Sequence, residues 1–222
     1  SIAVEGWHST IFAPYFIIGA IHSGVSGVVT LMAGLLWLYK LDKYIKPDHF
    51  DAVGRLLVIV ATIWFLALFL EWVYALYPLE DPEIALRNMQ VFQTPWSYLG
   101  LIFLLTGFII PVGAWCFKSV RRSPMWMFFT TILVNIGMWL ERFLIIVPGL
   151  SRRTELSFNW GSYSPSLVEM GLVTFTFAFV ICGVIVFARI FPLIPPFDLK
   201  EGMRFRHVIK VGKKNISAVV RE

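Results

Sequence analysis

The sequence predicts an all-α membrane protein with five transmembrane helices in an up-down bundle, with the N-terminus outside and the C-terminus cytoplasmic. The chain of 222 residues is 58% hydrophobic and only 15% charged, whereas soluble domains carry about 25% charged residues. Its apolar residues fall in five long blocks separated by polar connections. Basic residues are concentrated in alternate connections, which predicts the orientation.

Each apolar block is long enough to cross the roughly 30 Å hydrocarbon core of a membrane as an α-helix, whereas a membrane β-strand needs only about ten residues. The first block is too long for a cleaved signal peptide and no basic segment precedes it. We therefore predict a transmembrane bundle over 1–191 and an extended cytoplasmic tail over 192–222. The predicted spans cover 10–39, 52–77, 97–117, 125–147 and 166–191.

The connections differ sharply in their content of Lys and Arg. Three such residues lie at 40–51, three at 118–123 and seven in the tail, whereas the two other connections hold only three between them. Positive residues favour the cytoplasmic side. The net charge of +5 therefore reflects topology, with possible contacts to acidic lipid or a protein partner. We predict no nucleic-acid partner, and the tail also contains short β-like stretches.

Metal and haem ligands are sparse in the sequence. The two cysteines, Cys116 and Cys182, lie far apart in apolar blocks and form no metal or haem motif. A haem held by two histidines would need a second histidine at the depth of His22, but His49 and His207 are expected on the cytoplasmic side and His8 on the outer side. We therefore predict no metal or haem in this chain.

Three charged residues interrupt the apolar blocks toward the predicted outer face. Glu71 and Arg142 each lie six residues before the end of an outward-running span, about 9 Å deep at 1.5 Å per residue. Glu141 and Arg142 are adjacent and project about 100° apart, so we expect them not to pair with each other and expect Glu71 to be the partner of Arg142. Buried ionisable residues indicate function by default, although such pairs also join helices.

Three further ionisable residues are candidates. Glu169 begins the fifth span and His8 precedes the first, so both are expected at the outer face, where a purely interfacial role is the alternative. His22 lies twelve residues into the first span, about 18 Å deep, among small residues. A histidine at this depth can relay protons or simply bond a neighbouring helix.

Quinol binding fits this set of residues. A quinol releases protons as it gives up electrons, so its hydroxyl groups need acceptors such as Glu or His, and the quinone oxygens need donors such as Arg. We expect the quinone site to use Arg142, Glu141, His8 and Glu71. Proton transfer would involve Glu71, Glu169 and His22. The electrons would pass to a cofactor on another subunit.

Three motifs resemble those of NrfD/PsrC-like membrane subunits. They are GWHSTIFAPYFIIGAIHSG at 6–24, NIGMWLERFLIIVP at 135–148 and YSPSLVEMG at 163–171. The first two resemble most closely ActC and ActF, the paired membrane subunits of bacterial alternative complex III, with ActC favoured. Such subunits have about twice as many spans, so this chain resembles their C-terminal half. We therefore expect it to be a processed chain or part of a longer one.

The resemblance implies menaquinol oxidation at the periplasmic face of a bacterial inner membrane, with a proposed proton path through the membrane subunits. It also implies an iron–sulfur subunit, c-type cytochrome subunits and a paralogous membrane subunit as partners. One alternative is an NrfD-type anchor of a molybdopterin or hydrogenase complex that reduces quinone. Alternatives of another class are a proton-coupled transporter and a structural scaffold subunit.

Overall fold

The computed structural model divides the chain into two compact units, Ser1–Tyr163 and Ser164–Glu222. The residues that the structure describes are 7, 9–41, 44–150, 152–154, 157–160, 163–191, 208–211 and 214–217.

Five helical segments in the described residues are long and apolar enough to cross a membrane, which confirms the predicted helical membrane protein. The first unit contains α1 (Phe12–Tyr39), α2 (Pro47–Leu76), a third span over Trp96–Trp115, and α7 (Pro124–Leu150). The second unit contains α8 (Leu167–Ile190). The predicted orientation of the termini and the up-down order remain predictions.

Short elements join the spans. Helix α3 (Asp81–Phe92) lies between α2 and the third span, and α6 (Lys118–Arg121) precedes α7. Strands β1 (Arg152–Thr154) and β2 (Ser157–Trp160) form an antiparallel pair after α7, and β3 (Val208–Val211) pairs with β4 (Lys214–Ser217) in the tail. These two pairs add strands to a protein predicted to be all-α. Strands β3 and β4 fall where the sequence shows short β-like stretches.

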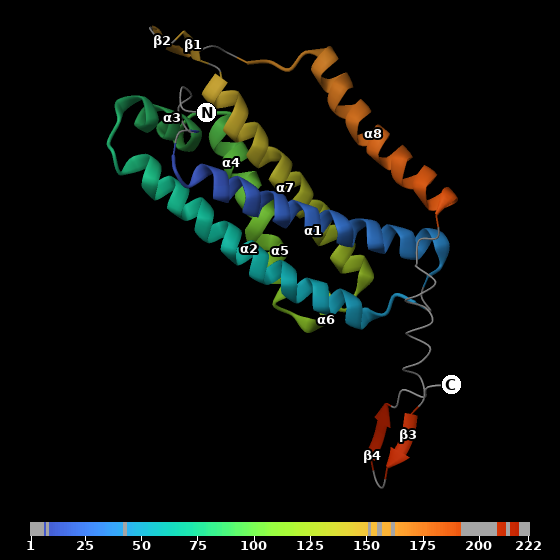
Figure 1. The fold of residues 1–222 in the computed structure, drawn as a ribbon. Coiled ribbons are helices and arrows are strands. Elements are labelled where there is room, and N and C mark those ends of the chain that lie inside the picture. Colours follow the sequence, from blue (N-terminus) through green and yellow to red (C-terminus); the bar gives the residue numbers. More distant parts are fainter. Residues whose placement is uncertain are drawn as a thin grey trace. The chain divides into compact units, whose positions relative to one another are not determined.

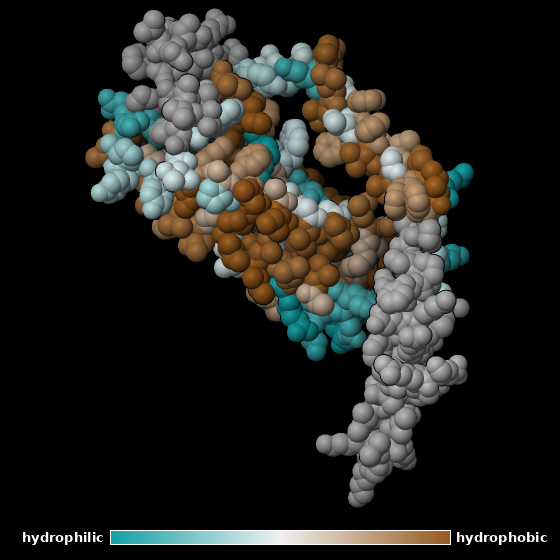
Figure 2. Space-filling model, viewed as in Figure 1, coloured by the Kyte–Doolittle hydropathy of each residue, from teal (hydrophilic) through white to brown (hydrophobic). Residues whose placement is uncertain are grey.

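The order of elements along the first unit can be followed in Figure 1. Helix α1 packs against both α2 and α7. Helices α1 and α7 run antiparallel, because Tyr15 contacts Glu141 near one end and Thr30 contacts Thr131 farther along. A broad hydrophobic band covers α1 and α2, and hydrophilic residues gather over α3 and α6 at the two ends (Figure 2). This is the pattern expected for a membrane-spanning unit.

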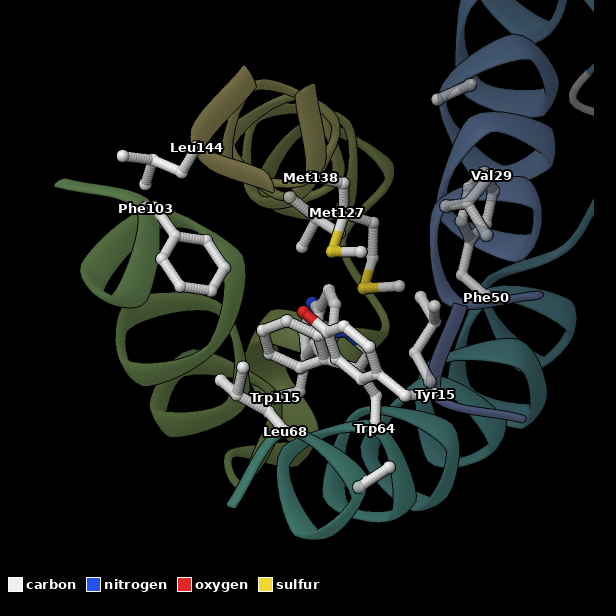
Figure 3. Close-up of a cluster of buried hydrophobic side chains, with 14 residues drawn as sticks. Tyr15, Val29, Phe50, Trp64, Leu68, Phe103, Trp115, Met127, Met138 and Leu144 are labelled. Carbon is white, nitrogen blue, oxygen red and sulfur yellow. The ribbon is translucent and has the colours of Figure 1, made fainter. Parts of the chain in front are cut away.

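Aromatic and methionine side chains fill the centre of the first unit. Trp64 and Trp115 are fully buried, and Met127 and Met138 of α7 point into the same interior (Figure 3). Trp115 Nε1 donates a hydrogen bond of 2.9 Å to Thr130 Oγ1, so its one polar atom is satisfied. Buried tryptophan usually finds such a partner.

An ion-pair cluster fixes the end of the unit opposite α3. Asp51, at the start of α2, is buried and accepts hydrogen bonds from Arg55 and from Arg121, whose Nε lies 2.9 Å away. Arg121 also donates to the backbone oxygen of Trp115. One guanidinium therefore joins the start of α2 to the end of the third span.

The third span contains a π-helical turn. Helix α4 (Trp96–Leu104) continues into the π-helix η1 (Leu105–Ile109) and then α5 (Ile110–Trp115). Pro111 has no backbone N–H, so it cannot donate to the oxygen of Gly107, four residues earlier. Such turns are rare and frequently accompany functional sites.

Helix α7 crosses this π-helical turn at a pair of glycines. A Cβ atom added to Gly137 would lie 2.5 Å from the nitrogen of Gly107 and 2.7 Å from its Cα. Backbone atoms cannot yield as a flexible side chain can. A Cβ added to Gly107 would meet its nearest neighbour, Gly137 Cα, at an ordinary 3.8 Å. The close approach therefore needs glycine on the α7 side only.

We predict that Gly137→Ala lowers the free energy of unfolding by about 1–3 kcal/mol, because the added methyl group separates α7 from η1. Gly107→Ala, at the same crossing, is the matched control and should change it by less than about 1 kcal/mol. Thermal unfolding of the detergent-solubilised protein measures both. Equal stability of the two variants would contradict the asymmetry of this contact.

Candidate functional site

A cavity of about 460 Å³ lies between α2, α3, the third span and α7, next to the start of α1. Its wall is mostly apolar and includes the aromatic side chains of Phe12, Trp72 and Phe103. Its polar side chains are Tyr15, Glu71, Arg87, Gln90, Ser97 and Glu141. The cavity therefore combines an apolar wall with a few polar groups, as small-molecule sites usually do.

Three exposed apolar residues border this cavity. Val91 of α3, Leu101 of α4 and Ile109 of η1 line it and are 42%, 58% and 49% exposed. An apolar molecule could enter at this border from the hydrocarbon of a membrane. The acidic residues Glu71 and Glu141 are both buried.

The first acidic group of the cavity is held by α3. Arg87 Nη2 donates to Glu71 Oε1 at 2.8 Å and lies 3.2 Å from Glu83 Oε1. All three side chains are buried, and the guanidinium also lies over the Trp72 ring at 4.8 Å. Glu83 and Arg87 are four residues apart and share a face of α3. That face of α3 therefore lies toward α2, and its Arg87 is the ion-pair partner of Glu71.

The second acidic group belongs to α7. Glu141 Oε1 accepts hydrogen bonds from the hydroxyl of Tyr15 and from Trp64 Nε1, the latter at 3.1 Å. Its other oxygen lies 3.6 Å from Arg142 Nη2. Two donors from two neighbouring helices and a nearby positive charge hold this carboxylate in the apolar interior. One edge of Glu141 still borders the cavity.

Arg142 lies elsewhere than predicted. Its guanidinium covers the ring of Phe16 at 3.8 Å and donates to the Phe16 backbone oxygen at 3.4 Å. Gly19 leaves room for it, because a Cβ there would lie 2.6 Å from Arg142 Nη2. Arg142 is absent from the cavity lining. It therefore flanks the site on the α1 side.

Two geometric predictions from the sequence are therefore wrong. Glu71 pairs with Arg87 instead of Arg142. Glu141 and Arg142 do approach each other, although their Cα–Cβ bonds diverge. The reason is side-chain length, because an arginine side chain is long enough to bend back across the helix surface. The angle of about 100° per residue determines only the direction of the Cα–Cβ bond, and not the position of the guanidinium at the end of the side chain.

His22 is fully buried between α1, α2 and the third span. Its ring stacks on Trp64, with centroids 5.6 Å apart, and Nε2 lies 3.2 Å from the oxygen of Gly107. A carbonyl oxygen only accepts, so Nε2 carries the proton in this contact. His22 thus replaces the donor that Pro111 lacks. Its Nδ1 has no hydrogen-bond partner among the described residues.

The two remaining predicted residues do not belong to the described part of the first unit. His8 lies outside the described residues. Glu169 lies in the second unit, where its carboxylate accepts from the Ser166 backbone N–H at 2.7 Å and its own N–H donates to Ser166 Oγ at 3.2 Å. This capping box starts α8.

Sequence reasoning missed Arg87, Tyr15 and Gln90 as members of the site. From the sequence, Arg87 is one of three basic residues in the predicted outer connections, and Tyr15 is an aromatic residue of the first apolar block. A signal was present, because Asp81 and Pro82 can begin a helix and Glu83 and Arg87 then share one face of it. In the described residues, no group of three or more His, Cys, Asp or Glu could hold a metal ion.

The chain is similar to known membrane-subunit sequences. The family model described as polysulphide reductase, NrfD matches residues 1–152. A curated relative, the Hdr-like menaquinol oxidoreductase integral membrane subunit of Archaeoglobus fulgidus, is 28% identical over 218 residues. The match covers 89% of this chain and 52% of the relative. The chain therefore spans about half the length of that relative.

We predict that Tyr15→Phe lowers the free energy of unfolding by about 1–3 kcal/mol, because the buried Glu141 carboxylate loses one of its two donors. Tyr98→Phe is the control, since Tyr98 is 64% exposed and should give less than about 0.5 kcal/mol. Thermal unfolding of the purified protein measures both. An unchanged midpoint for Tyr15→Phe would show that the tyrosine contributes nothing to holding Glu141.

Proposed function

The chain belongs to the NrfD polysulphide reductase family, and we propose that it is a quinol-binding membrane subunit of an electron-transfer complex. The observation that carries this proposal is the cavity beside Glu71 and Glu141, which has buried acidic groups and an exposed apolar border. A quinol has the matching character, with an apolar ring and tail and two hydroxyl groups. Menaquinol is the favoured substrate, as the name of the Archaeoglobus relative suggests.

The proposed reaction oxidises the quinol to quinone. Both hydroxyl O–H bonds break, two protons leave to protein acceptors and two electrons leave to an oxidant. The oxidant is an iron–sulfur centre of a partner subunit, followed by c-type haems of further subunits. This chain would supply binding, orientation and proton acceptance.

Four polar residues of the cavity have proposed roles. Glu71 and Glu141, when ionised, accept the quinol protons, since carboxylates are acceptors only. Arg87 and Gln90 can donate to the quinone oxygens. The aromatic wall, with Trp72 and Phe103, would hold the ring in place. Arg142 is proposed to act through Glu141, whose charge it compensates from 3.6 Å.

The complex itself is proposed to be alternative complex III or a close relative of it, with this chain equivalent to half of ActC or ActF. We propose a multi-pass protein of a bacterial inner membrane, and the distribution of basic residues supports placing the cavity at its periplasmic face. A paralogous membrane subunit and the rest of a longer chain would complete the site. His8 and Glu169 are proposed to contribute from the same face.

A polar row supports proton transfer away from the cavity. Beyond His22, Ser26 Oγ donates to Asn135 Oδ1 at 3.0 Å, Asn135 Nδ2 lies 3.4 Å from Thr30 Oγ1, and that hydroxyl donates to Thr131 at 2.8 Å. The row joins α1 to α7 along the interior. We propose that His22 takes part in a proton relay along this row.

We predict that Glu71→Gln and Glu141→Gln each lower kcat for menaquinol-dependent reduction of the acceptor by about 100-fold, because each removes a proton acceptor. Glutamine keeps the size and a hydrogen-bonding oxygen. The assay uses the purified complex, and Asp81→Asn, an exposed acid on the same side of the unit, is the control. Wild-type rates in both glutamate variants would reject the quinol site.

For His22 we predict that replacement by Leu lowers the number of protons translocated per electron while quinol oxidation continues, because the relay loses its one titratable group at that depth. Proteoliposomes with a pH-sensitive dye measure the ratio. Ser23→Ala is the control, since Ser23 Oγ bonds only the Ala20 oxygen within its own helix. An unchanged ratio in the leucine variant would remove His22 from the relay.

A further inference from the structure

A second, smaller cavity of about 220 Å³ lies next to the first. It is lined by Ser9, Thr10, Tyr74, Ala75, Pro78, Glu80 and Glu83. Four of these residues, Thr10, Tyr74, Pro78 and Glu80, are exposed. The second cavity therefore opens at the surface of the unit, and Glu83 is its fully buried acidic group.

One guanidinium nitrogen connects the two cavities. Glu71 lines the larger cavity and Glu83 the smaller one, and neither lines both. Arg87 Nη2 lies 2.8 Å from Glu71 Oε1 and 3.2 Å from Glu83 Oε1, so these oxygens are within 6.0 Å of each other. Two hydrogen bonds of about 3.0 Å each, still within the usual range, span that limit, so one water molecule can bridge the two oxygens.

The charges of the cluster favour a mobile proton. Arginine stays protonated in proteins, so Arg87 and two ionised carboxylates together carry a net charge of −1. All three side chains are buried, where a net charge is costly. A proton held by either carboxylate removes that charge. The pair can therefore accept one proton from the first cavity while Arg87 keeps both carboxylates in place.

We propose that Glu83 carries the quinol proton accepted by Glu71 out of the site through the second cavity. This inference rests on the proposed quinol function. The proton leaves the quinol hydroxyl for Glu71, then moves through the bridging water to Glu83 and on to water in the second cavity. After each release both carboxylates are as they began, so the route consumes nothing. The electrons leave separately to the iron–sulfur centre.

The border of the first cavity gives a reason for a separate exit. Val91, Leu101 and Ile109 are apolar and offer no group that could carry a proton. The second cavity is lined by two hydroxyl groups of Ser9 and Thr10 and by a second carboxylate, Glu80, at its exposed rim. The substrate would thus enter on the apolar side and the proton would leave on the polar side.

Glu83→Gln in the complete complex tests the route, because glutamine keeps an oxygen for Arg87 but cannot carry the proton. We expect kcat for quinol oxidation to fall at least about tenfold, with KM for quinol changed by less than about twofold. Added formate, small enough for the second cavity, should restore the rate in proportion to its concentration. Glu83→Asp, which keeps a carboxylate, should retain most of the activity.

Asp81→Asn serves as the control on the same helix and should keep wild-type rates without formate. A wild-type kcat in Glu83→Gln would overturn the route. So would a raised KM with no response to formate, which would mark Glu83 as purely structural. A slow Glu71→Gln beside a normal Glu83→Gln would reject only the exit route, whereas wild-type rates in Glu71→Gln, Glu141→Gln and Glu83→Gln would reject the quinol site as well.

Discussion

The ion pair between Arg87 and Glu71 is the contact on which the arrangement of the site depends. Glu71 lies in an apolar helix, where lipid offers no hydrogen bond, so it needs a partner within the protein. Arg87 supplies that partner from α3 at 2.8 Å and brings Glu83 with it. Helix α3 is thereby held against α2. Residues of α3 then form one wall of the larger cavity. Without this pair a buried charge would stand alone.

The need of a buried charge for partners within the protein also explains the contacts of two other buried acidic residues of the first unit. Glu141 is held by Tyr15 and Trp64, and Asp51 by Arg55 and Arg121. The groups nevertheless differ in what surrounds them. Asp51 lies at the end opposite α3 and borders neither cavity, whereas Glu71 and Glu141 both border the larger one. Solvation of buried charge alone therefore accounts for Asp51, whereas the two glutamates also border a cavity, as the proposed function requires.

Backbone constraints shape the region between the cavity and the polar row. Pro111 removes the donor that would bond the Gly107 oxygen, and His22 replaces it from another helix. Gly137 lets α7 approach that same turn closely. A proline, a histidine and a glycine from three different spans thus meet at one point. The three residues are far apart in the sequence, where nothing links them. In the folded unit their contacts around Gly107 together hold the His22 ring in place.

The sequence alone was sufficient for the five helical spans and the family resemblance, because both depend on apolar length and on motifs within single segments. It also identified Glu71, Glu141 and His22 as unusual, since ionisable residues in apolar helices are costly wherever they point. The partners of those residues were decided by tertiary structure. Arg87 reaches Glu71 because α3 folds back onto α2, and Arg142 bends toward Glu141 because its side chain is long and flexible. Helix periodicity gives the direction in which a side chain leaves the backbone, whereas only packing decides what it meets.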